Sequence, residues 1–217
     1  MSDIGSPPAY PLDFYARPAE VVAPSLLGAT LRVVGRDGVV RSGRIVETEA
    51  YVGPHDLACH AAKGRTRRTE VMFGRAGHAY VYLVYGLHEL FNVVTGADGE
   101  AQAVLVRALE PAPGTRGLGD AGRGDGPGRL TRLLDIDRRL LGAPLDRPPL
   151  TLHPGRPPPR VVATPRVGVD YAGREWADAP LRFVDPDSAQ LSLSLARLGP
   201  GGYSSRGVRD PSRTPAT

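Results

Sequence analysis

The chain has 217 residues, of which 41% are hydrophobic, and these values favour one compact domain or two small ones and exclude disorder throughout. Its formal net charge of +4, with Lys63 as the one lysine among many arginines, permits nucleic-acid binding, although genomic base composition would give the same bias. The single Cys59 excludes an intrachain disulfide and a cysteine metal cluster, and because no signal pattern or long apolar run is present we expect a soluble cytoplasmic protein.

Short strands dominate the predicted elements. They are expected at residues 29–34, 44–51, 79–94, 101–109, 166–173 and 181–184. A Gly-Arg-Asp-Gly turn joins the first two strands, and Tyr85-Gly86 interrupts the third segment. Helices are expected at residues 56–62 and at residues 128–136, where three leucines form one stripe. Because strands and helices do not alternate regularly, we expect an α+β fold with a mixed or antiparallel sheet.

Stretches rich in proline, glycine and serine mark the expected loops and tails. We expect one domain over residues 1–217, with flexible tails at about residues 1–12 and 199–217. Two further loop-rich segments cover residues 111–128 and 153–160. The first of these is long enough to be a mobile loop with a functional role.

The strand at residues 43–51, GRIVETEAY, carries an unusual polar face. Side chains alternate across a strand, so Glu47, Glu49 and Tyr51 share one face and the residues between them face the core. One interpretation is a half-exposed strand whose outer face is solvated. The other is a cleft in which a carboxylate beside an aromatic ring acts as a general base.

A metal site is conceivable in the segment that follows this strand. It would combine Glu49, His55, Asp56 and His60. The two histidines are five residues apart, which does not align them on a helix as the i, i+4 zinc pair of metalloproteases is aligned. The spacing is therefore not characteristic of a metal site.

Three of the eight tyrosines fall within six residues, in the run AYVYLVY. Tyr80 and Tyr82 share a strand face, and Tyr85 lies next to Gly86, near a predicted hairpin tip. Cross-strand packing is the usual role of tyrosine in sheets. The alternative is a stacking platform for a planar ligand, with a projecting side chain at the turn.

Two polar residues interrupt strands that are otherwise apolar. Asn92 lies in LFNVV and Arg107 lies in AVLVRAL. A buried arginine needs an anion or several acceptors, so Arg107 is expected to meet a carboxylate on a neighbouring strand. Glu47 and Glu49 are the candidates, and a purely structural salt bridge remains an open alternative.

These segments together resemble one family, the alkyladenine (3-methyladenine) DNA glycosylases. The resemblance covers about residues 15–185 and rests on the ordered motifs GRIVETEAY, GPHDLACH, GRTRRTEVMFG, HAYVYLVYG, FNVV, LVRALEP, GPGRL and RVGVDYAG. Each motif is weak alone, whereas the ordered set is specific. The resemblance implies a single mixed α+β domain around a curved antiparallel sheet, from which a β-hairpin protrudes to intercalate into DNA.

The resemblance implies catalytic roles for three residues. Glu49 matches the general base that activates the water attacking the sugar C1′. Arg107 matches the arginine that helps to hold this water, and Val167 matches a position whose main-chain carbonyl contacts it.

The resemblance also implies a pocket for a flipped base. Tyr51 and His60 match residues that sandwich the base, and Tyr82 matches the opposite wall. Asn92 matches the residue that disfavours guanine by crowding its 2-amino group. Tyr85 matches the side chain that fills the gap left by the flipped nucleotide.

Contacts to the DNA backbone are expected from Met72, Arg65 and Arg129. The chain departs from the family pattern in the same region, with Arg67 where proline is common and Thr69 where asparagine is common. The segment AGREWA, farther along the chain, also carries one residue more than the usual AGEWA. These departures leave the proposed catalytic set unchanged.

The implied activity is that of a monofunctional DNA glycosylase of base excision repair. It would flip alkylated or deaminated purines (3-methyladenine, 7-methylguanine, hypoxanthine or ethenoadenine) out of duplex DNA and hydrolyse the N-glycosidic bond. Lys63 lies in a loop, so water rather than a lysine is the expected nucleophile. We expect no metal, cofactor or membrane, and a monomer in the nucleoid region of the cytoplasm. A catalytically silent binder of damaged DNA and a metal-dependent hydrolase are the alternatives.

Overall fold

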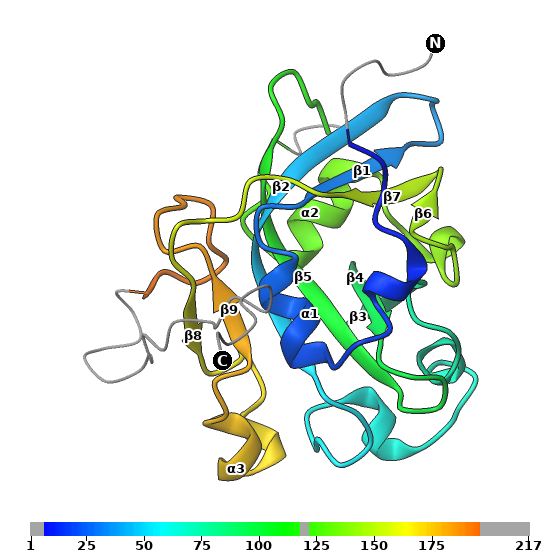
Figure 1. The fold of residues 1–217 in the computed structure, drawn as a ribbon, viewed down its shortest axis with the longest axis vertical. Coiled ribbons are helices and arrows are strands. Elements are labelled where there is room, and N and C mark those ends of the chain that lie inside the picture. Colours follow the sequence, from blue (N-terminus) through cyan, green and yellow to red (C-terminus); the bar gives the residue numbers. More distant parts are fainter. Residues whose placement is uncertain (1–6, 118–121, 196–217) are drawn as a thin grey trace, which may run out of the picture.

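The computed structural model describes residues 7–117 and 122–195, and in these residues nine strands form one antiparallel sheet (Figure 1). The strands are β1 (Thr30–Val34), β2 (Val40–Tyr51), β3 (Ala79–Val84), β4 (His88–Thr95), β5 (Gln102–Pro111), β6 (Asp146–Arg147), β7 (Leu150–His153), β8 (Val162–Thr164) and β9 (Arg182–Val184). Their order is β3-β4-β5-β2-β1-β7-β6, with the pair β8-β9 joined to β2. The expected α+β class with a strongly curved antiparallel sheet is confirmed.

Strand β2 connects the parts of the sheet. One of its edges pairs with β5, whereas the other pairs first with β1 and then, from Glu47 to Glu49, with β9. The register with β5 shifts on both sides of Glu47, which marks a β-bulge. The bulge and the change of partner place the acidic part of β2 between two strands that pair with its edges, and consecutive residues from Ile45 to Ala50 are buried, so both of its faces are covered as well.

The main core lies between the sheet and two helices. These are α1 (Ala19–Ser25) and α2 (Pro127–Leu134), and the interior apolar positions of β2, β4 and β5 belong to the same cluster. Helix α2 begins with Pro127, whose fixed φ suits the first turn, and it buries Leu130, Leu133 and Leu134. A second cluster beside the sheet contains Cys59, Met72 and Tyr80. This second cluster supports the pocket described below.

In the part of the chain that the structure describes, five 3₁₀ helices and one short α-helix lie before or between the strands. They are η1 (Leu12–Phe14), η2 (His60–Lys63), η3 (Glu70–Phe73), η4 (Arg138–Leu140), η5 (Asp170–Ala172) and α3 (Arg174–Ala177). Among the helices of the described residues, none is long and apolar enough to cross a membrane.

Two predicted elements are wrong. Residues 166–173 form a turn followed by η5 rather than a strand, because Gly168 and Gly173 adopt φ values of 75° and 80°, which interrupt an extended chain. The helix expected at residues 56–62 is replaced by a turn and the single 3₁₀ turn η2. The other predicted strands and the helix near residues 128–136 are confirmed with shifted ends.

Residues 7–12, which belong to the expected N-terminal tail, pack on the fold, and residues 1–6 lie outside the described residues. The Tyr10 N–H donates to the Leu152 carbonyl, and the Tyr10 ring stacks on Phe14 at 3.9 Å between centroids. Residues 7–12 are therefore attached to the sheet. The expected tail at residues 199–217 and part of the expected loop at residues 111–128 lie outside the described residues.

Candidate active site

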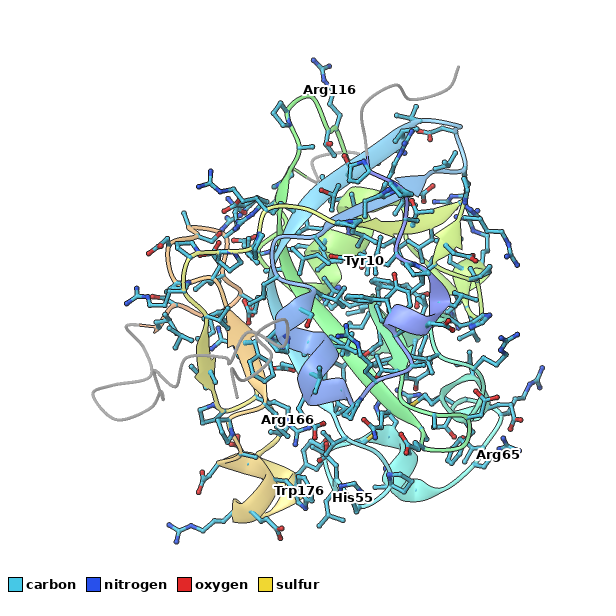
Figure 2. The ribbon with its side chains drawn as sticks, viewed as in Figure 1. Tyr10, His55, Arg65, Arg116, Arg166 and Trp176 are labelled. Atoms are coloured by element: carbon cyan, nitrogen blue, oxygen red, sulfur yellow. The ribbon has the colours of Figure 1, made fainter. Side chains whose placement is uncertain are left out.

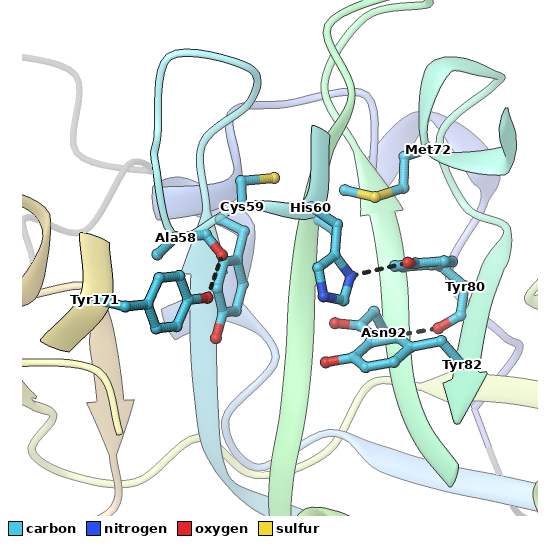
Figure 3. Close-up of a pocket in the computed structure, with 10 residues that line it drawn as sticks. Ala58, Cys59, His60, Met72, Tyr80, Tyr82, Asn92 and Tyr171 are labelled. Atoms are coloured by element: carbon cyan, nitrogen blue, oxygen red, sulfur yellow. Dashed lines mark hydrogen bonds between the residues drawn. The ribbon is translucent and has the colours of Figure 1, made fainter. Parts of the chain in front are cut away.

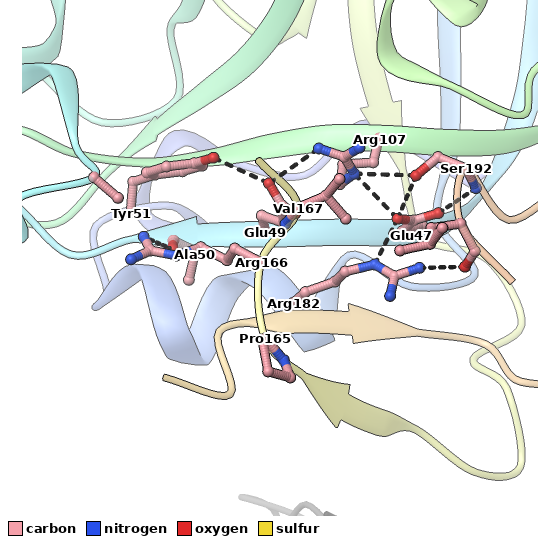
Figure 4. A network of polar contacts seen from close by, with 12 residues as sticks. Glu47, Glu49, Ala50, Tyr51, Arg107, Pro165, Arg166, Val167, Arg182 and Ser192 are labelled. Atoms are coloured by element: carbon pink, nitrogen blue, oxygen red, sulfur yellow. Dashed lines mark hydrogen bonds and ion pairs between the residues drawn. The ribbon is translucent and has the colours of Figure 1, made fainter. Parts of the chain in front are cut away.

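The acidic face of β2 is buried rather than solvated. Glu47 and Glu49 are both 0% exposed, so the interpretation as a half-exposed polar face is wrong. Two unpaired carboxylates could not remain charged in such a place, because the cost of desolvating each of them is several kcal/mol. Their partners therefore define the site (Figure 4).

Glu49 accepts three hydrogen bonds from three separate elements. The Tyr51 hydroxyl donates to Oε2 at 3.0 Å, Arg107 Nη1 donates to the same oxygen at 3.3 Å, and the Val167 N–H donates to Oε1 at 2.8 Å. The structure thus brings together all three residues expected to be catalytic, with Tyr51 joining them. Val167 contacts Glu49 through its N–H. The expected contact of its carbonyl with the attacking water stays a prediction.

Glu47 belongs to a neighbouring network. Its Oε1 accepts from Arg107 Nε at 3.1 Å and from Arg182 Nε at 2.7 Å, and Ser192 donates to both carboxylate oxygens. The side chain of Arg182 is 0% exposed. Two carboxylates thus face two guanidinium groups in the interior, and Glu47 pairs with both Arg107 and Arg182.

Arg107 is the group that joins the two carboxylates. Burial lowers the pKa of its guanidinium, but the negative charges of Glu49 and Glu47 outweigh burial and the net pKa is raised. Arg107 thus meets a carboxylate on a neighbouring strand, as expected, and both candidates, Glu47 and Glu49, pair with it.

The ring of Tyr51 is fixed between Glu49 and a second buried ion pair. Arg166 Cζ lies 4.7 Å from the centroid of this ring, and the Arg166 guanidinium bonds to Asp56 at 2.5 and 2.9 Å. Burial, followed by the charge of Glu49, raises the pKa of Tyr51 well above its usual value, so its hydroxyl stays protonated and can donate. Figure 2 shows Arg166 beside Trp176, whose carbonyl it also contacts at 3.4 Å.

The metal-site hypothesis finds no support in this geometry. Asp56 is occupied by Arg166, the His55 ring packs edge-on against Trp176, and His60 bonds to Tyr80. In residues 7–117 and 122–195, no group of three or more His, Cys, Asp or Glu side chains is arranged to hold a metal ion.

An aromatic pocket opens beside Tyr51 (Figure 3). Its lining residues are Tyr51, Ala58, Cys59, His60, Met72, Tyr80, Tyr82, Asn92, Ala103 and Tyr171. All four residues expected to form a base pocket are among them. The pocket and the carboxylate site share Tyr51, whose ring lines the first and whose hydroxyl bonds to Glu49.

The wall opposite Tyr51 is formed by η2 and β3. The His60 ring lies edge-on to Tyr82, with centroids 4.6 Å apart, and His60 Nδ1 is 2.9 Å from the Tyr80 hydroxyl. Asn92 Nδ2 donates to the Tyr80 carbonyl at 3.1 Å, across the β3-β4 pair. These contacts hold the wall in place before any ligand enters.

His60 is neutral near physiological pH. Burial, followed by the positive charges of Arg68 and Lys63, lowers its pKa from 6.5 to about 4. A neutral ring that lines the pocket can stack on a cationic ligand without repelling it.

The β3-β4 hairpin carries an exposed aromatic side chain at its tip. Tyr85 is 92% exposed and has a φ of 51°, and Gly86 follows with a φ of 70°. Positive φ at both central residues is typical of the tight turn that joins twisted strands, and a non-glycine residue there is strained. The predicted projecting side chain at the turn is present, and its contact with DNA stays a prediction.

The three residues assigned to the DNA backbone lie in different environments. Met72 is 2% exposed and lines the pocket, so its side chain is buried in the second core cluster instead of facing a phosphate, which differs from the expectation. Arg65 and Arg129 are exposed and make surface ion pairs with Glu70 and Asp125. Such pairs are weak, so both arginines remain free to exchange partners with a phosphate.

Several site residues were missed by the sequence analysis. Arg182 and Ser192 hold Glu47, Arg166 supports Tyr51, and Tyr171 lines the pocket, whereas Asp56, considered above as a metal ligand, instead pairs with Arg166. One signal was available for Arg182, an arginine inside the apolar strand LRFV, which resembles the setting of Arg107.

Comparison with known proteins identifies the family. Residues 13–189 match the family described as methylpurine-DNA glycosylase (MPG). A relative from Myxococcus xanthus is 58% identical over 84% of this chain and 92% of its own length. Relatives from Legionella pneumophila and Methanocella arvoryzae are each 46% identical, over 84% and 85% of this chain and over 97% and 96% of their own lengths. All three carry the provisional name 3-methyladenine DNA glycosylase. The chain belongs to the methylpurine-DNA glycosylase family of DNA repair enzymes.

Proposed function

We propose that this chain is a monofunctional glycosylase that removes alkylated or deaminated purines from duplex DNA. In the proposed reaction the C1′–N bond breaks, its electron pair leaves with the base, and a water oxygen bonds to C1′. Glu49 takes the proton of this water, and its negative charge stabilises the sugar cation that forms as the bond breaks. The products are a free base and an intact strand with an abasic site.

The observation that carries the proposal is the environment of Glu49. A fully buried carboxylate, oriented by three donors, lies at the edge of an aromatic pocket. Donors fixed in this way need little reorganisation during the reaction, which is the main source of electrostatic catalysis. A purely structural carboxylate would not need to be adjacent to a pocket lined by four tyrosines and a histidine.

The pocket fits a planar, flipped-out purine. Tyr51 on one side, and His60 with Tyr82 on the other, offer ring faces and edges to a base. For cationic bases such as 3-methyladenine and 7-methylguanine, the aromatic faces contribute about 0.5 to 2 kcal/mol, and a neutral His60 adds no repulsion. Flipping costs least for damaged or mispaired bases, which supports selectivity for lesions over normal bases.

A water nucleophile fits the residues of the site better than a lysine does. Lys63 is the one lysine of the sequence and lies at the end of η2, outside the lining of the pocket. A lyase step through a Schiff base therefore has no nucleophile in place. We further propose one catalytic domain that acts as a monomer on DNA in the nucleoid, because every assigned group lies in one chain.

The test is single-turnover release of base from duplex oligonucleotides that contain hypoxanthine or 7-methylguanine, with EDTA present. The native chain should release the base and leave an unbroken abasic strand. Glu49→Gln should bind the same duplexes with similar affinity and lose on the order of 10²- to 10⁴-fold in rate.

Native-like release by Glu49→Gln would exclude Glu49 as the general base. Tight binding without release by the native chain would instead favour the catalytically silent binder of damaged DNA. Loss of release on addition of EDTA would point to the metal-dependent hydrolase.

A further inference from the structure

The segment after β9 folds back over the buried carboxylate network. The Asp185 N–H donates to the Val46 carbonyl at 2.9 Å, which starts the return of the chain across β2. Ser192 then lies against Glu47 and Arg107, as Figure 4 shows, and the Leu193 carbonyl lies against Arg182. Ser192 lies beyond residue 189, where the match to the family ends.

Ser192 makes three polar contacts with the network. Its N–H donates to Glu47 Oε2 at 2.6 Å, and its hydroxyl donates to Glu47 Oε1 at 2.7 Å. The same hydroxyl oxygen accepts from Arg107 Nε at 3.1 Å. In the next residue, the Leu193 carbonyl accepts from Arg182 Nη2 at 2.7 Å. One serine hydroxyl therefore bridges the buried carboxylate and the arginine that reaches Glu49.

The two carboxylates compete for Arg107. Its Nε is shared between Glu47 and Ser192, and its Nη1 reaches Glu49 at 3.3 Å, the longest of the three contacts of Glu49. A guanidinium group is a rigid fork, so the angle of the Nε contact sets the direction of Nη1. Ser192 fixes this angle by accepting a hydrogen bond from Nε. Together with Arg182, Ser192 also donates hydrogen bonds to Glu47, so Arg107 Nη1 is left to donate to Glu49.

We infer that Ser192 is a positioning residue that holds Arg107 in the orientation required by Glu49. The inference rests on the proposed function, because it requires Glu49 to be the reacting carboxylate. Ser192 acts through Arg107 and touches no reacting atom. The segment after β9, residues 185–193, is the return segment. It is thus part of the catalytic apparatus and does not only cover the sheet.

The same segment supplies a matched control. The Ser188 hydroxyl donates to Glu110 Oε1 at 2.6 Å, so it also ties the return segment to a glutamate, but one that pairs with Arg44 near the Gly43–Pro111 end of the β2-β5 pair. Glu110 bonds to Arg44, and neither residue contacts Glu49 in the contacts described above. Ser188→Ala therefore reports the loss of a serine-to-carboxylate bond without disturbing Arg107.

The experiment compares Ser192→Ala, Ser188→Ala and Ser192→Thr in the full chain, with hypoxanthine duplex as the substrate. We measure the maximal single-turnover rate at saturating enzyme, the Kd for the duplex and the Tm. Ser192→Ala should lower the maximal rate about 10-fold, with the Kd within about twofold of native, because it misaligns one fixed donor. Ser188→Ala should keep the native rate, and Ser192→Thr should restore it because threonine retains the hydroxyl.

A double-mutant cycle separates positioning from general stability. In an Arg107→Gln background, Ser192→Ala should cause no further loss of rate, because its effect passes through Arg107. An additive 10-fold loss, or equal rates for Ser192→Ala and Ser188→Ala, would overturn the inference. Release by the native chain and its loss in Glu49→Gln are scored separately, so failure of the proposed function is distinguishable from failure of this inference.

Discussion

The carboxylate network and the hairpin tip are built in opposite ways. Glu49 is fully buried, and its two oxygens are held by donors from β2, β5 and the turn after β8. Tyr85 is 92% exposed and sits on a strained turn. The groups proposed for bond cleavage are therefore ordered before DNA binds. The side chain proposed to fill the gap in DNA instead has little contact with the rest of the fold.

The pocket wall lies between these extremes. His60 and Tyr82 are partly buried and contact each other, but their surroundings are open enough to receive a ligand. Stability should therefore depend most on the network, less on the wall and least on the hairpin tip. Substitutions in the three regions test this order of expected effects on stability.

Glu47→Gln should have the largest effect on stability. The change leaves Arg107 and Arg182 buried with one negative partner fewer, so we expect a loss of about 3 to 5 kcal/mol in the free energy of unfolding. Urea denaturation measures this loss. The control is Glu110→Gln, which removes a partly exposed pair with Arg44 and should cost less than about 1 kcal/mol.

The excision rate of Glu47→Gln at saturating DNA should also fall. Expressed as a change in activation free energy, this loss should be smaller than the loss in the free energy of unfolding. If the two variants lost equal stability, the proposed difference between buried and surface ion pairs in this sheet would be wrong.

His60 should make stability depend on pH. Its folded pKa of about 4 lies below the ordinary value of 6.5, so between these values the unfolded chain binds a proton that the folded chain does not. Lowering the pH from 6.5 to 5 should therefore reduce the free energy of unfolding by about 1 to 2 kcal/mol, allowing for the partial exposure of the ring.

His60→Gln should remove this part of the pH dependence. His88→Gln, at an exposed histidine of the hairpin, should leave it unchanged. Unfolding curves of the three proteins at pH 5 and 6.5 measure the difference. Identical slopes for the native chain and His60→Gln would show that His60 is not held neutral by its surroundings.

Tyr85→Gly should have the smallest effect on stability. Glycine adopts a φ of 51° without strain, and Tyr85 makes little contact with the fold, so the free energy of unfolding should stay within about 1 kcal/mol of native. Excision should nevertheless fall about 10-fold or more, because nothing then fills the gap left by the flipped nucleotide.

The control for Tyr85→Gly is Val39→Ala, which removes an exposed apolar side chain from the β1-β2 turn and should change neither quantity. A native excision rate for Tyr85→Gly would contradict the proposed role of the hairpin tip.

Local sequence signals predicted much of the sheet. Alternating side chains located β2, the turn residues Tyr85 and Gly86 separated β3 from β4, and the leucine stripe located α2. The motifs around Glu49 and Arg107 also indicated the family before any geometry was known. Residues 166–173 were assigned wrongly, because their strand-like composition hid two glycines with positive φ.

Local sequence specifies which residue types are present and which of them alternate along a strand. The burial of β2 on both sides depends on the folded chain, because the bulge at Glu47 and the pairing with β9 involve residues far along the sequence. For the same reason the roles of Arg182 and Ser192 emerged only from the folded chain. A buried charge is stabilised by whichever donors the fold brings within hydrogen-bonding distance, and sequence spacing does not specify those donors.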